Sequence, residues 1–418
     1  MTGKSMRQLV DDCVHCGFCL PTCPTYVLWS EEMDSPRGRI DLMSGRLDGS
    51  IGLTDTVVEH FDRCLGCMAC VSSCPSGVAY DQLIERTRAD LEAEVRRAPA
   101  DRTARELLFS VLPYPARLRA ALALEPLGRR APLPPALATL RDLAPRWRSS
   151  DAPPALTEPA SEPIARVGLL LGCVQQAVFG DVNVATARVL SADGLAVVAP
   201  EGQACCGALS VHAGRLEEGR RRARRLIDVF EASEVDVVVV NAAGCGSTVK
   251  EYGRLLAEDP VYADRAAAFA GRVRDVSEAV VGLGGRAKRR RLDLRVAFQD
   301  SCHLLHAQRV RDAPRSMLEA IPGIDLCEPL EQELCCGSAG VYNVLQPDAA
   351  RELGDRKAAN VLGQLPDIYA SGNPGCLVQV SSALHRAGWP LPAVHPIELV
   401  DASIRGVAAR DVVAHARA

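Results

Sequence analysis

Short apolar runs alternate with amphipathic or charged stretches through the second half of the chain. The runs RVGLLLGC (166–173), VDVVVVNAAGC (235–245) and LRVAFQDSC (294–302) are shorter than typical helices and rich in Val and Leu, so we expect buried strands. The helical period occurs near residues 181–193, 214–233 and 347–363. Because strands alternate with helices, the pattern predicts α/β layers with largely parallel strands.

This order of elements occurs twice. In both copies a strand ends at a single cysteine, a Cys-Cys-Gly (CCG) motif follows, and a later apolar run ends at another cysteine. Corresponding cysteines are 129, 130 and 131 residues apart: Cys173 and Cys302, Cys206 and Cys336, Cys245 and Cys376. Such even offsets indicate an internal duplication, with CCG repeat 1 at 165–283 and CCG repeat 2 at 292–410. The basic run GGRAKRRR (284–291) between them lacks interleaved aromatics, so we interpret it as a solvated loop and expect no nucleic-acid partner.

The cysteines of the two repeats are candidate cofactor-binding residues. In open α/β sheets, ligands collect outside the carboxyl ends of the strands, where these cysteines are expected. Gly207 and Gly337 permit the sharp turn that points adjacent cysteines toward one site. A lone buried cysteine is often just a small apolar residue, but that reading does not explain eight in matched positions. The eight candidates are Cys173, Cys205, Cys206, Cys245, Cys302, Cys335, Cys336 and Cys376.

Cysteine is the unusual residue of the composition. The chain has 418 residues and 17 cysteines, and its net charge of −4 gives no general attraction to nucleic acid. The N-terminus does not resemble a secretory signal, and we see no run of about 18 apolar residues, so we expect a cytosolic chain with reduced thiols. Clustered cysteines in that compartment favour metal or redox chemistry over disulfides.

The first 80 residues contain two identical cysteine quartets. Each has the spacing C-x2-C-x2-C-x3-C followed by proline, which is the bacterial two-cluster ferredoxin run. The fourth cysteine of each run ligates the other cluster in such ferredoxins, so we expect crossed ligation of two [4Fe–4S] clusters within residues 1–92. A four-cysteine zinc site and buried structural thiols are the alternatives. The candidate metal ligands are Cys13, Cys16, Cys19 and Cys74 for one cluster, and Cys64, Cys67, Cys70 and Cys23 for the other.

An Arg- and Pro-rich segment joins the two halves. We expect an amphipathic helix over 90–112, short helical pieces broken by prolines, and a flexible linker at 151–163, within a connector that spans 93–164. Residues 95–150 contain 11 arginines and four acidic residues, a charge of +7. The segment is either a solvated connector or a basic surface for an anionic membrane or an acidic partner.

Several stretches together resemble the iron–sulfur subunit of bacterial glycolate oxidase. They are CVHCGFCLPTCPTY, SPRGRIDLM, CLGCMACVSSCPSGVAY, DSCHLLHAQRV and CCGSAGVYNVLQPDAARELGDRK. The anaerobic glycerol-3-phosphate dehydrogenase small subunit, lactate-utilisation proteins and heterodisulfide reductase subunits share this architecture. The resemblance implies a multidomain α+β and α/β fold, in which a helical-loop ferredoxin-type domain precedes the duplicated α/β CCG domain.

The chain departs from the heterodisulfide reductases in one respect. Their CCG motif ends in CxxC, whereas here Thr248 and Gln379 occupy the position of the last cysteine. A non-cubane cluster is therefore in doubt, and an ordinary iron–sulfur cluster, another metal or a thiol pair stays open. His303 and His306 are candidate substitute ligands or structural histidines. Cys327, without a counterpart in repeat 1, is expected to be an inert core thiol.

The resemblance implies a non-catalytic electron-transfer subunit of a glycolate or 2-hydroxy-acid oxidase. Hydride chemistry would belong to flavin-containing partner subunits, because this chain has no dinucleotide fingerprint and no catalytic triad. Electrons would leave from the CCG region to a membrane quinone or another acceptor, with the protein peripheral on the inner face of the cytoplasmic membrane. A lactate or glycerol-3-phosphate dehydrogenase complex is the alternative, as is a CCG half that serves only for docking.

Overall fold

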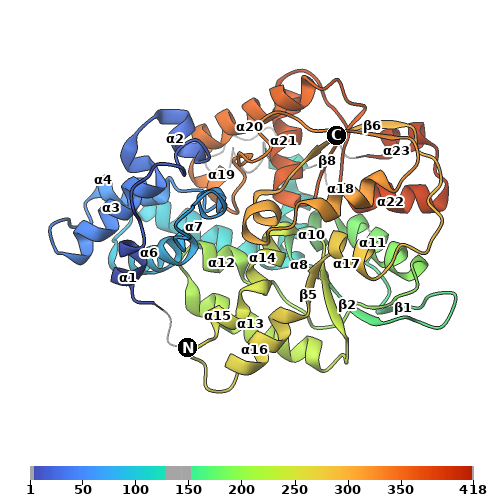
Figure 1. Cartoon of the computed structure of the whole chain (residues 1–418), viewed down its shortest axis with the longest axis horizontal. Helices are drawn as coiled ribbons and strands as arrows, with labels where there is room; N and C mark the ends of the chain where they lie inside the picture. The colour runs from blue at the N-terminus through green and yellow to red at the C-terminus, as the bar shows by residue number, and fades with distance from the viewer. Residues whose placement is uncertain (1–3, 129–142, 144–151, 417–418) are drawn as a thin grey trace.

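The computed structural model describes residues 4–128, 143 and 152–416. Figure 1 shows a small helical domain at the N-terminal end beside a larger body that contains both sheets. The first CCG repeat forms one half of this body and the second forms the other half. The predicted combination of a helical ferredoxin-type domain with a duplicated α/β domain is confirmed by this arrangement together with the family matches reported below.

The N-terminal domain consists of short helices around the two quartets. A proline occupies the first turn of both α2 and α3, where its missing N–H costs nothing and its fixed φ suits a helix. Phe61, Leu83 and Ile84 are fully buried in its core. Its elements are α1 (Met6–Asp11), α2 (Pro24–Trp29), the 3-10 turn η1 (Glu32–Asp34), α3 (Pro36–Leu47), α4 (Asp55–Asp62), α5 (Ala69–Ser72) and α6 (Tyr80–Glu94).

The two CCG repeats have sheets of the same topology. The first sheet has the order β1-β3-β2-β4-β5 and the second β7-β6-β8-β9, so that β2, β3, β4 and β5 correspond to β6, β7, β8 and β9. All these strands pair in parallel, and only β1 is antiparallel. The strands are β1 (Leu156–Thr157), β2 (Arg166–Leu170), β3 (Ala196–Val198), β4 (Val237–Val240), β5 (Val273–Asp275), β6 (Leu294–Gln299), β7 (Ile324–Cys327), β8 (Ile368–Ser371) and β9 (Ala393–Val394).

Alternate strand residues face two different cores, as the period of two requires. Val167 and Leu169 of β2 face a core that includes Val296 and Ile368 of the second sheet, so the two repeats share one hydrophobic interior. Leu170 faces the opposite side, where α13 and α16 cover the first sheet. This shared core holds the two repeats in a fixed relation.

The helices predicted at 181–193, 214–233 and 347–363 are present as α11, α13 and α20. Repeat 1 contains α10 (Val174–Val178), α11 (Gly180–Ala192), α12 (Ala208–His212), α13 (Leu216–Glu231), α14 (Ala243–Lys250), α15 (Tyr252–Leu255), α16 (Ala263–Gly271) and α17 (Val276–Gly282). Repeat 2 contains the π-helical turn η2 (His303–Ala307), α18 (Asp312–Glu319), α19 (Tyr342–Leu345), α20 (Pro347–Leu362), α21 (Pro374–Arg386), α22 (Pro396–Arg405) and α23 (Ala409–His415).

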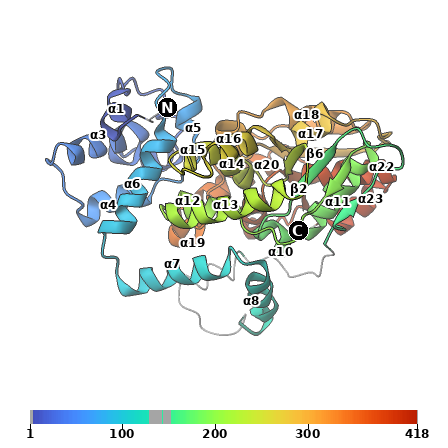
Figure 2. The same cartoon turned by 90° about the horizontal axis from the view of Figure 1, so that it is seen from below.

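The predicted single helix over 90–112 is wrong. α6 ends at Glu94 and α7 (Pro99–Val111) begins after a break, because the residue before a proline avoids the helical region and Ala98 is extended. Figure 2 shows α7 and α8 (Pro115–Gly128) along one side of the molecule, away from the N-terminal quartets. Leu118 and Leu122 of α8 pack against Ala177 of α10.

The predicted flexible linker at 151–163 needs a similar correction. Within it, β1 pairs with β3 through Leu156 and Val198, and so covers the edge of the first sheet. Of the short helical pieces expected over 112–150, α8 is present, and the stretch after Gly128 lies outside the described residues, apart from Leu143. Among the described helices, none is long and apolar enough on its own to cross a membrane; α7 and the first part of α8, bent by 112°, meet the length and composition criteria only as a pair.

Candidate functional site

The structure brings the two N-terminal quartets together in crossed groups. One small cavity, of about 30 Å³, is lined by three cysteines of the first quartet and by Cys70 and Cys74 of the second. A neighbouring cavity of about 20 Å³ is lined by three cysteines of the second quartet and the last cysteine of the first. Cys70 lines this neighbouring cavity as well and is counted there. We call Cys13, Cys16, Cys19 and Cys74 the outer group, and Cys23, Cys64, Cys67 and Cys70 the inner group.

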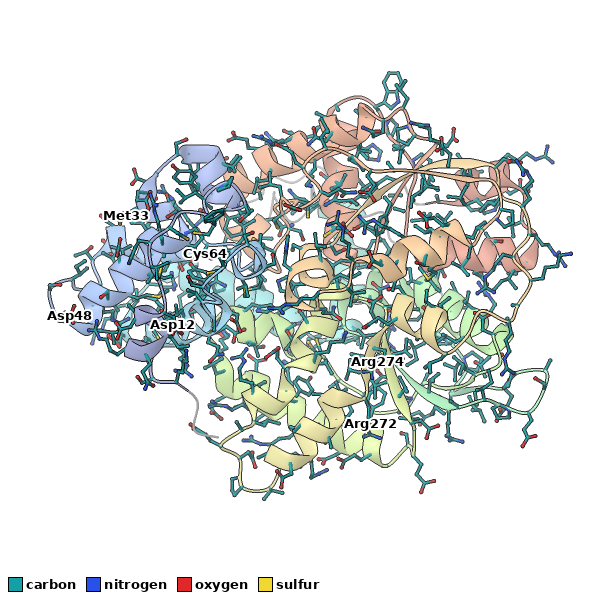
Figure 3. The ribbon with its side chains drawn as sticks, in the orientation of Figure 1. Asp12, Met33, Asp48, Cys64, Arg272 and Arg274 are labelled. Atoms are coloured by element: carbon teal, nitrogen blue, oxygen red, sulfur yellow. The ribbon has the colours of Figure 1, made fainter. Side chains whose placement is uncertain are left out.

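The two groups differ in exposure. Cys16 of the outer group is exposed and its three companions are partly exposed, whereas all four inner cysteines are buried. Figure 3 shows Cys64 on the side of the N-terminal domain that faces the CCG repeats, with Asp12 and Asp48 farther out. The inner group therefore lies between the outer group and the rest of the molecule.

Positive backbone φ angles shape both cysteine loops. Gly17 has φ 86° and Gly66 has φ 64°, values that glycine adopts without strain. A second residue with a left-handed backbone lies two positions from each glycine: His15 before Gly17, and Met68 after Gly66. Such turns direct successive N–H groups toward an anionic guest, and the Gly66 N–H already donates to Cys64 Sγ over 3.4 Å.

Two cations, the buried Arg39 and the partly exposed Arg88, act on Cys64 of the inner group. Arg39 is only 1% exposed; its Nε donates to the His60 carbonyl over 2.6 Å and its guanidinium pairs with Asp34 at 3.3 Å. Burial by itself would raise the pKa of Cys64, but the charges of Arg39 and Arg88 outweigh that effect and lower it. The inner site thus stabilises negative charge on sulfur. Burial raises the pKa of Cys67 and Cys70 well above the ordinary range, so these thiols need a bound metal to deprotonate.

The first CCG repeat gathers its four cysteines at the carboxyl edge of its sheet. Cys173 precedes α10, and its Sγ lies 3.4 Å from Cys205 Sγ. The hydrogen bonds from Cys173 and Cys206 lower the pKa of Cys205 well below its usual range. Cys245 does not end a strand as predicted: β4 ends at Val240, and Cys245 lies in the first turn of α14.

The second repeat has the same arrangement. Cys302 Sγ lies 3.9 Å from Cys335 Sγ, and Asn373 Nδ2 donates to Cys376 Sγ over 3.5 Å. Cys376 is again in the first turn of a helix, α21, and not at a strand end. In both repeats this helix turn replaces the predicted strand terminus, so the cysteine side chain is held by a helix that begins at the sheet edge.

The glycine of each CCG motif meets two requirements at once. Gly337 has φ 89°, and a Cβ there would lie 2.7 Å from the Ala350 carbonyl oxygen of α20. Gly207 has φ 85°, and its Cβ would lie 3.2 Å from the Gly219 backbone of α13. Glycine therefore allows both the turn of the paired cysteines and the close approach of the next helix.

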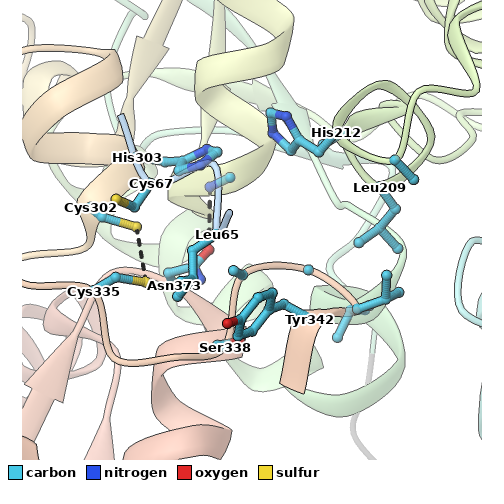
Figure 4. A pocket seen from close by; sticks show the side chains of 18 of the residues that line it. Leu65, Cys67, Leu209, His212, Cys302, His303, Cys335, Ser338, Tyr342 and Asn373 are labelled. Atoms are coloured by element: carbon cyan, nitrogen blue, oxygen red, sulfur yellow. Dashed lines mark hydrogen bonds between the residues drawn. The ribbon is translucent and has the colours of Figure 1, made fainter. Parts of the chain in front are cut away.

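A central cavity of about 220 Å³ connects these sites. All eight CCG cysteines line it, and so do Cys64 and Cys67 of the inner group. Figure 4 shows Cys67 beside Cys302 and Cys335, with His303 and His212 on the same wall. Three segments far apart in the chain thus bring ten cysteines to one space.

Direct hydrogen bonds join the three walls. His303 Nε2 donates to the Gly66 carbonyl over 3.0 Å, and Arg88 bonds both the Cys64 carbonyl and, at 2.8 Å, the His212 carbonyl. The rings of His212 and His303 meet edge to face, 4.8 Å between centroids. The two repeats are linked by the Gly244 N–H, which donates to Asn373 Oδ1 over 3.2 Å.

Both candidate histidines use both ring nitrogens. His303 Nδ1 bonds Ser247 Oγ at 2.8 Å in addition to the Gly66 contact. His306 bonds Ser72 Oγ at 2.7 Å and the Glu333 carbonyl at 2.9 Å. In this structure they therefore act as structural links between the second repeat and its neighbours. Cys327 at the end of β7 donates to the Val296 carbonyl, as expected for a core thiol.

Family models match three parts of the chain. A 4Fe-4S dicluster domain matches residues 9–78, and a cysteine-rich domain matches residues 167–250 and again residues 296–381. The chain is 36% identical to the probable glycolate oxidase iron-sulfur subunit of Bacillus subtilis (strain 168), over 96% of this chain and 98% of that protein. It belongs to the family of glycolate oxidase iron–sulfur subunits. A second relative in this family, from Escherichia coli (strain K12), is 37% identical over 89% of both chains.

More distant relatives share only part of the length. Lactate utilization protein A of Oceanobacillus iheyensis is 29% identical over 58% of this chain and 98% of its own length. A crystal structure of a hypothetical protein from Helicobacter pylori superposes with a TM-score of 0.54 over 98% of this chain and 78% of the other, at 8% identity. That likeness shows a shared fold alone.

The residues of this family member fit the cofactors that its domains imply. Iron–sulfur clusters are supported by the dicluster match and by the paired cysteines of the two cysteine-rich domains. Within the described ranges, no three His, Cys, Asp or Glu side chains converge on one point as a single zinc ion requires. Thiolate groups around small cavities, one of them supplied with a backbone N–H, the buried Arg39 and the partly exposed Arg88, suit a cluster instead.

Sequence reasoning missed the arginines that serve the inner group. Arg39 lies within the conspicuous SPRGRIDLM stretch but carries no spacing signal, and Arg88 is one of two arginines on α6. Only the packing shows that these two guanidinium groups, and not the others, approach Cys64.

Proposed function

We propose that this chain is the electron-transfer subunit of a complex that oxidises glycolate, with flavin-containing partner subunits and a membrane quinone as acceptor. Oxidation of glycolate to glyoxylate removes two electrons and two protons. A quinone that receives both electrons takes up two protons to become the quinol. This chain supplies the path for the electrons, and the hydride chemistry belongs to the flavin partner.

One observation carries the proposal: Cys64 and Cys67 line both the inner-group cavity and the central cavity of the CCG cysteines. We assign the outer and inner groups as the ligands of the two [4Fe–4S] clusters, in the crossed pattern, and the CCG cysteines as ligands of further iron. When bound, such clusters accept and release single electrons. The sulfur sites then follow one another from the exposed Cys16 to the interior of both repeats without an intervening domain.

The chain's own residues prepare these sites. Arg39 and Arg88 stabilise negative charge at Cys64, and the buried position of the inner cysteines keeps water away. His303 fixes the Gly66 loop against the second repeat, so the distance between the inner group and Cys302 is set by a hydrogen bond and not by a mobile linker.

Attachment to the inner face of the cytoplasmic membrane is part of the proposal. Leu107 is exposed on α7, and Leu124, Arg117 and Arg119 are exposed on α8. Apolar side chains together with arginines suit an anionic lipid surface. Flotation with vesicles of phosphatidylglycerol tests this part separately: binding that does not depend on the anionic lipid would remove it.

The central test uses the complex purified with its flavin subunits. Cys67→Ser is expected to abolish quinone reduction while glycolate still bleaches the flavin absorbance. Cys327→Ser, which alters a core thiol outside the sulfur path, is the control and should leave both steps intact. If Cys67→Ser also stops flavin reduction, the cysteine holds the complex together and the electron path is wrong.

A 2-hydroxy acid other than glycolate is the second candidate substrate. The similarity to lactate utilization protein A over 58% of the chain favours lactate. Since the substrate would bind to the partner, the relative rates of flavin bleaching by glycolate and lactate decide between them.

A further inference from the structure

One phenylalanine of this protein is exposed, and it lies in the outer cysteine loop. The chain has seven phenylalanines. Phe18 is 64% exposed, whereas each of the other six is at most 6% exposed. Val14, in the same loop, is 67% exposed. The chain thus exposes one of its phenylalanines beside a cofactor site, where core packing does not require it.

Both apolar side chains belong to the wall of the outer site. Val14, Phe18 and Pro75 line the same small cavity as the outer cysteines. Cys16, between Val14 and Phe18 in the sequence, is itself exposed. The outer group is therefore the point where the sulfur path of the N-terminal domain reaches the surface, and it is framed by apolar residues.

Contacts with Arg37 fix the conformation of the outer cysteine loop within the chain itself. Arg37 Nη1 donates to the His15 carbonyl over 3.2 Å, and the same guanidinium bonds Glu32 at 2.5 Å through Nε. A Cβ at Gly17 would lie 2.9 Å from Arg37 Nη1, so the loop packs closely on this arginine. A preorganised apolar loop loses little conformational entropy on binding, which suits a docking surface.

The charges around the loop decide what kind of surface fits it. Asp11 and Asp41 are exposed nearby, and Asp41 lies 3.6 Å from His15 Nε2. The cations near the loop are already paired: Lys4 with Asp12 at 2.7 Å, and Arg37 with Glu32 at 2.5 Å. An anionic membrane would be repelled by this acidic rim, whereas a protein with an apolar recess and a basic edge would be attracted.

We propose that Val14 and Phe18 form the docking face for the flavin-bearing subunit, where electrons enter the chain at the outer group. This inference rests on the proposed function. Single electrons cross the interface, two for each substrate molecule, with no bond made or broken; the flavin is oxidised, the outer cluster is reduced, and the substrate protons go to water on the partner's side. Electrons would enter the chain at the face formed by Val14 and Phe18 and leave it from the CCG region.

The test uses the complex of the full chain co-expressed with its flavin subunits. In the double variant Val14→Ser/Phe18→Ser, affinity for the flavin subunits and the rate of cluster reduction by substrate are each expected to fall at least about tenfold. The iron content should not change, because neither residue is a cluster ligand, and dithionite should still reduce the clusters. The matched control is Leu365→Ser/Trp389→Ser, which removes two apolar side chains that are 84% and 66% exposed in repeat 2, before β8 and β9 and so at the sheet edge opposite the cysteines.

Other outcomes would overturn the docking face. Unchanged partner affinity and unchanged substrate-driven reduction in the double variant would show that the flavin subunit binds elsewhere. Loss of self-association or of vesicle binding, with partner affinity intact, would assign the loop to a second copy or to lipid. Failure of the proposed function itself looks different: in the wild-type complex, neither glycolate nor lactate would reduce the clusters although the flavin subunits remain bound.

Discussion

His303 Nε2 donates a hydrogen bond to the carbonyl oxygen of Gly66, 3.0 Å away, and so connects the second CCG repeat to the loop of the inner cysteines. His303 follows Cys302 directly, and Gly66 precedes Cys67. One hydrogen bond thus sets the separation of two neighbouring sulfur sites that belong to different domains.

Loss of this contact should weaken the junction. In His303→Ala, the buried Gly66 carbonyl loses its donor, and we expect the unfolding free energy to fall by about 1–3 kcal/mol. The EPR signal of the inner cluster should broaden because its loop is less fixed. Chemical denaturation of the iron-loaded protein and EPR of the reduced protein check this. His385→Ala, at an exposed position on α21, is the control; equal effects of the two substitutions would contradict a specific role for the contact.

Arg39 should affect both stability and redox behaviour. Arg39→Gln leaves the buried carboxylate of Asp34 with fewer cationic partners, which is expected to cost about 3–5 kcal/mol of unfolding free energy. Because the cation near Cys64 is removed, the reduction potential of the inner cluster should fall. An EPR-monitored redox titration measures this shift.

A surface arginine provides the comparison. Arg46→Gln removes an arginine whose acidic partners, Asp90 and Glu94, are half exposed, and such pairs contribute at most about 1 kcal/mol. Arg39→Lys keeps the charge and is expected to keep most of the potential even if stability falls. If Arg39→Gln leaves the potential unchanged, the guanidinium does not tune the cluster.

The stability of the chain should fall in mild acid through His395. Burial lowers the pKa of His395 to about 3, and its Nδ1 accepts a hydrogen bond from the Ile397 N–H over 3.1 Å. The unfolded histidine titrates near its usual pKa of about 6.5, so between about pH 6.5 and 3 the unfolded state binds more protons and stability is lost as pH decreases. At pH 5 the loss is about 2 kcal/mol relative to pH 7.

Denaturation curves at pH 7 and pH 5 measure this contribution. His395→Asn retains a side chain able to cap α22 and should reduce the pH dependence by about that amount. The exposed His385→Asn is the control. A pH dependence that is the same in wild type and His395→Asn would contradict the assignment.

The number of iron atoms per chain should show whether the CCG cysteines bind iron in addition to the two N-terminal clusters. Two [4Fe–4S] clusters alone give about eight iron atoms per chain, and we expect more, because the CCG cysteines bind additional iron. Serine at Cys205, Cys206, Cys335 and Cys336 should return the content to about eight while the EPR signals of the N-terminal clusters persist. About eight iron atoms in the wild-type protein would show that the CCG cysteines hold none.

The sequence predicts the structure within each domain better than the packing of the domains against one another. The crossed groups of cysteines follow from the spacing of the quartets, and the matching sheet order follows from the even offsets of the repeats. The approach of Cys67 to Cys335 has no such signal, because docking between domains depends on side-chain shape at positions far apart in the chain. Helix boundaries were missed where one residue decides, as at Pro99, and Cys245 was misplaced because a short apolar run does not show where the strand stops and the helix starts.

The central cavity also constrains how the protein is assembled. Its walls come from the N-terminal domain and from both repeats, and most of the ten cysteines around it are buried. A carrier protein that delivers iron and sulfide reaches the buried thiols less easily once the three walls have come together, since only Cys245 and Cys302 stay partly exposed. We therefore expect cofactor insertion to precede the final docking of the domains.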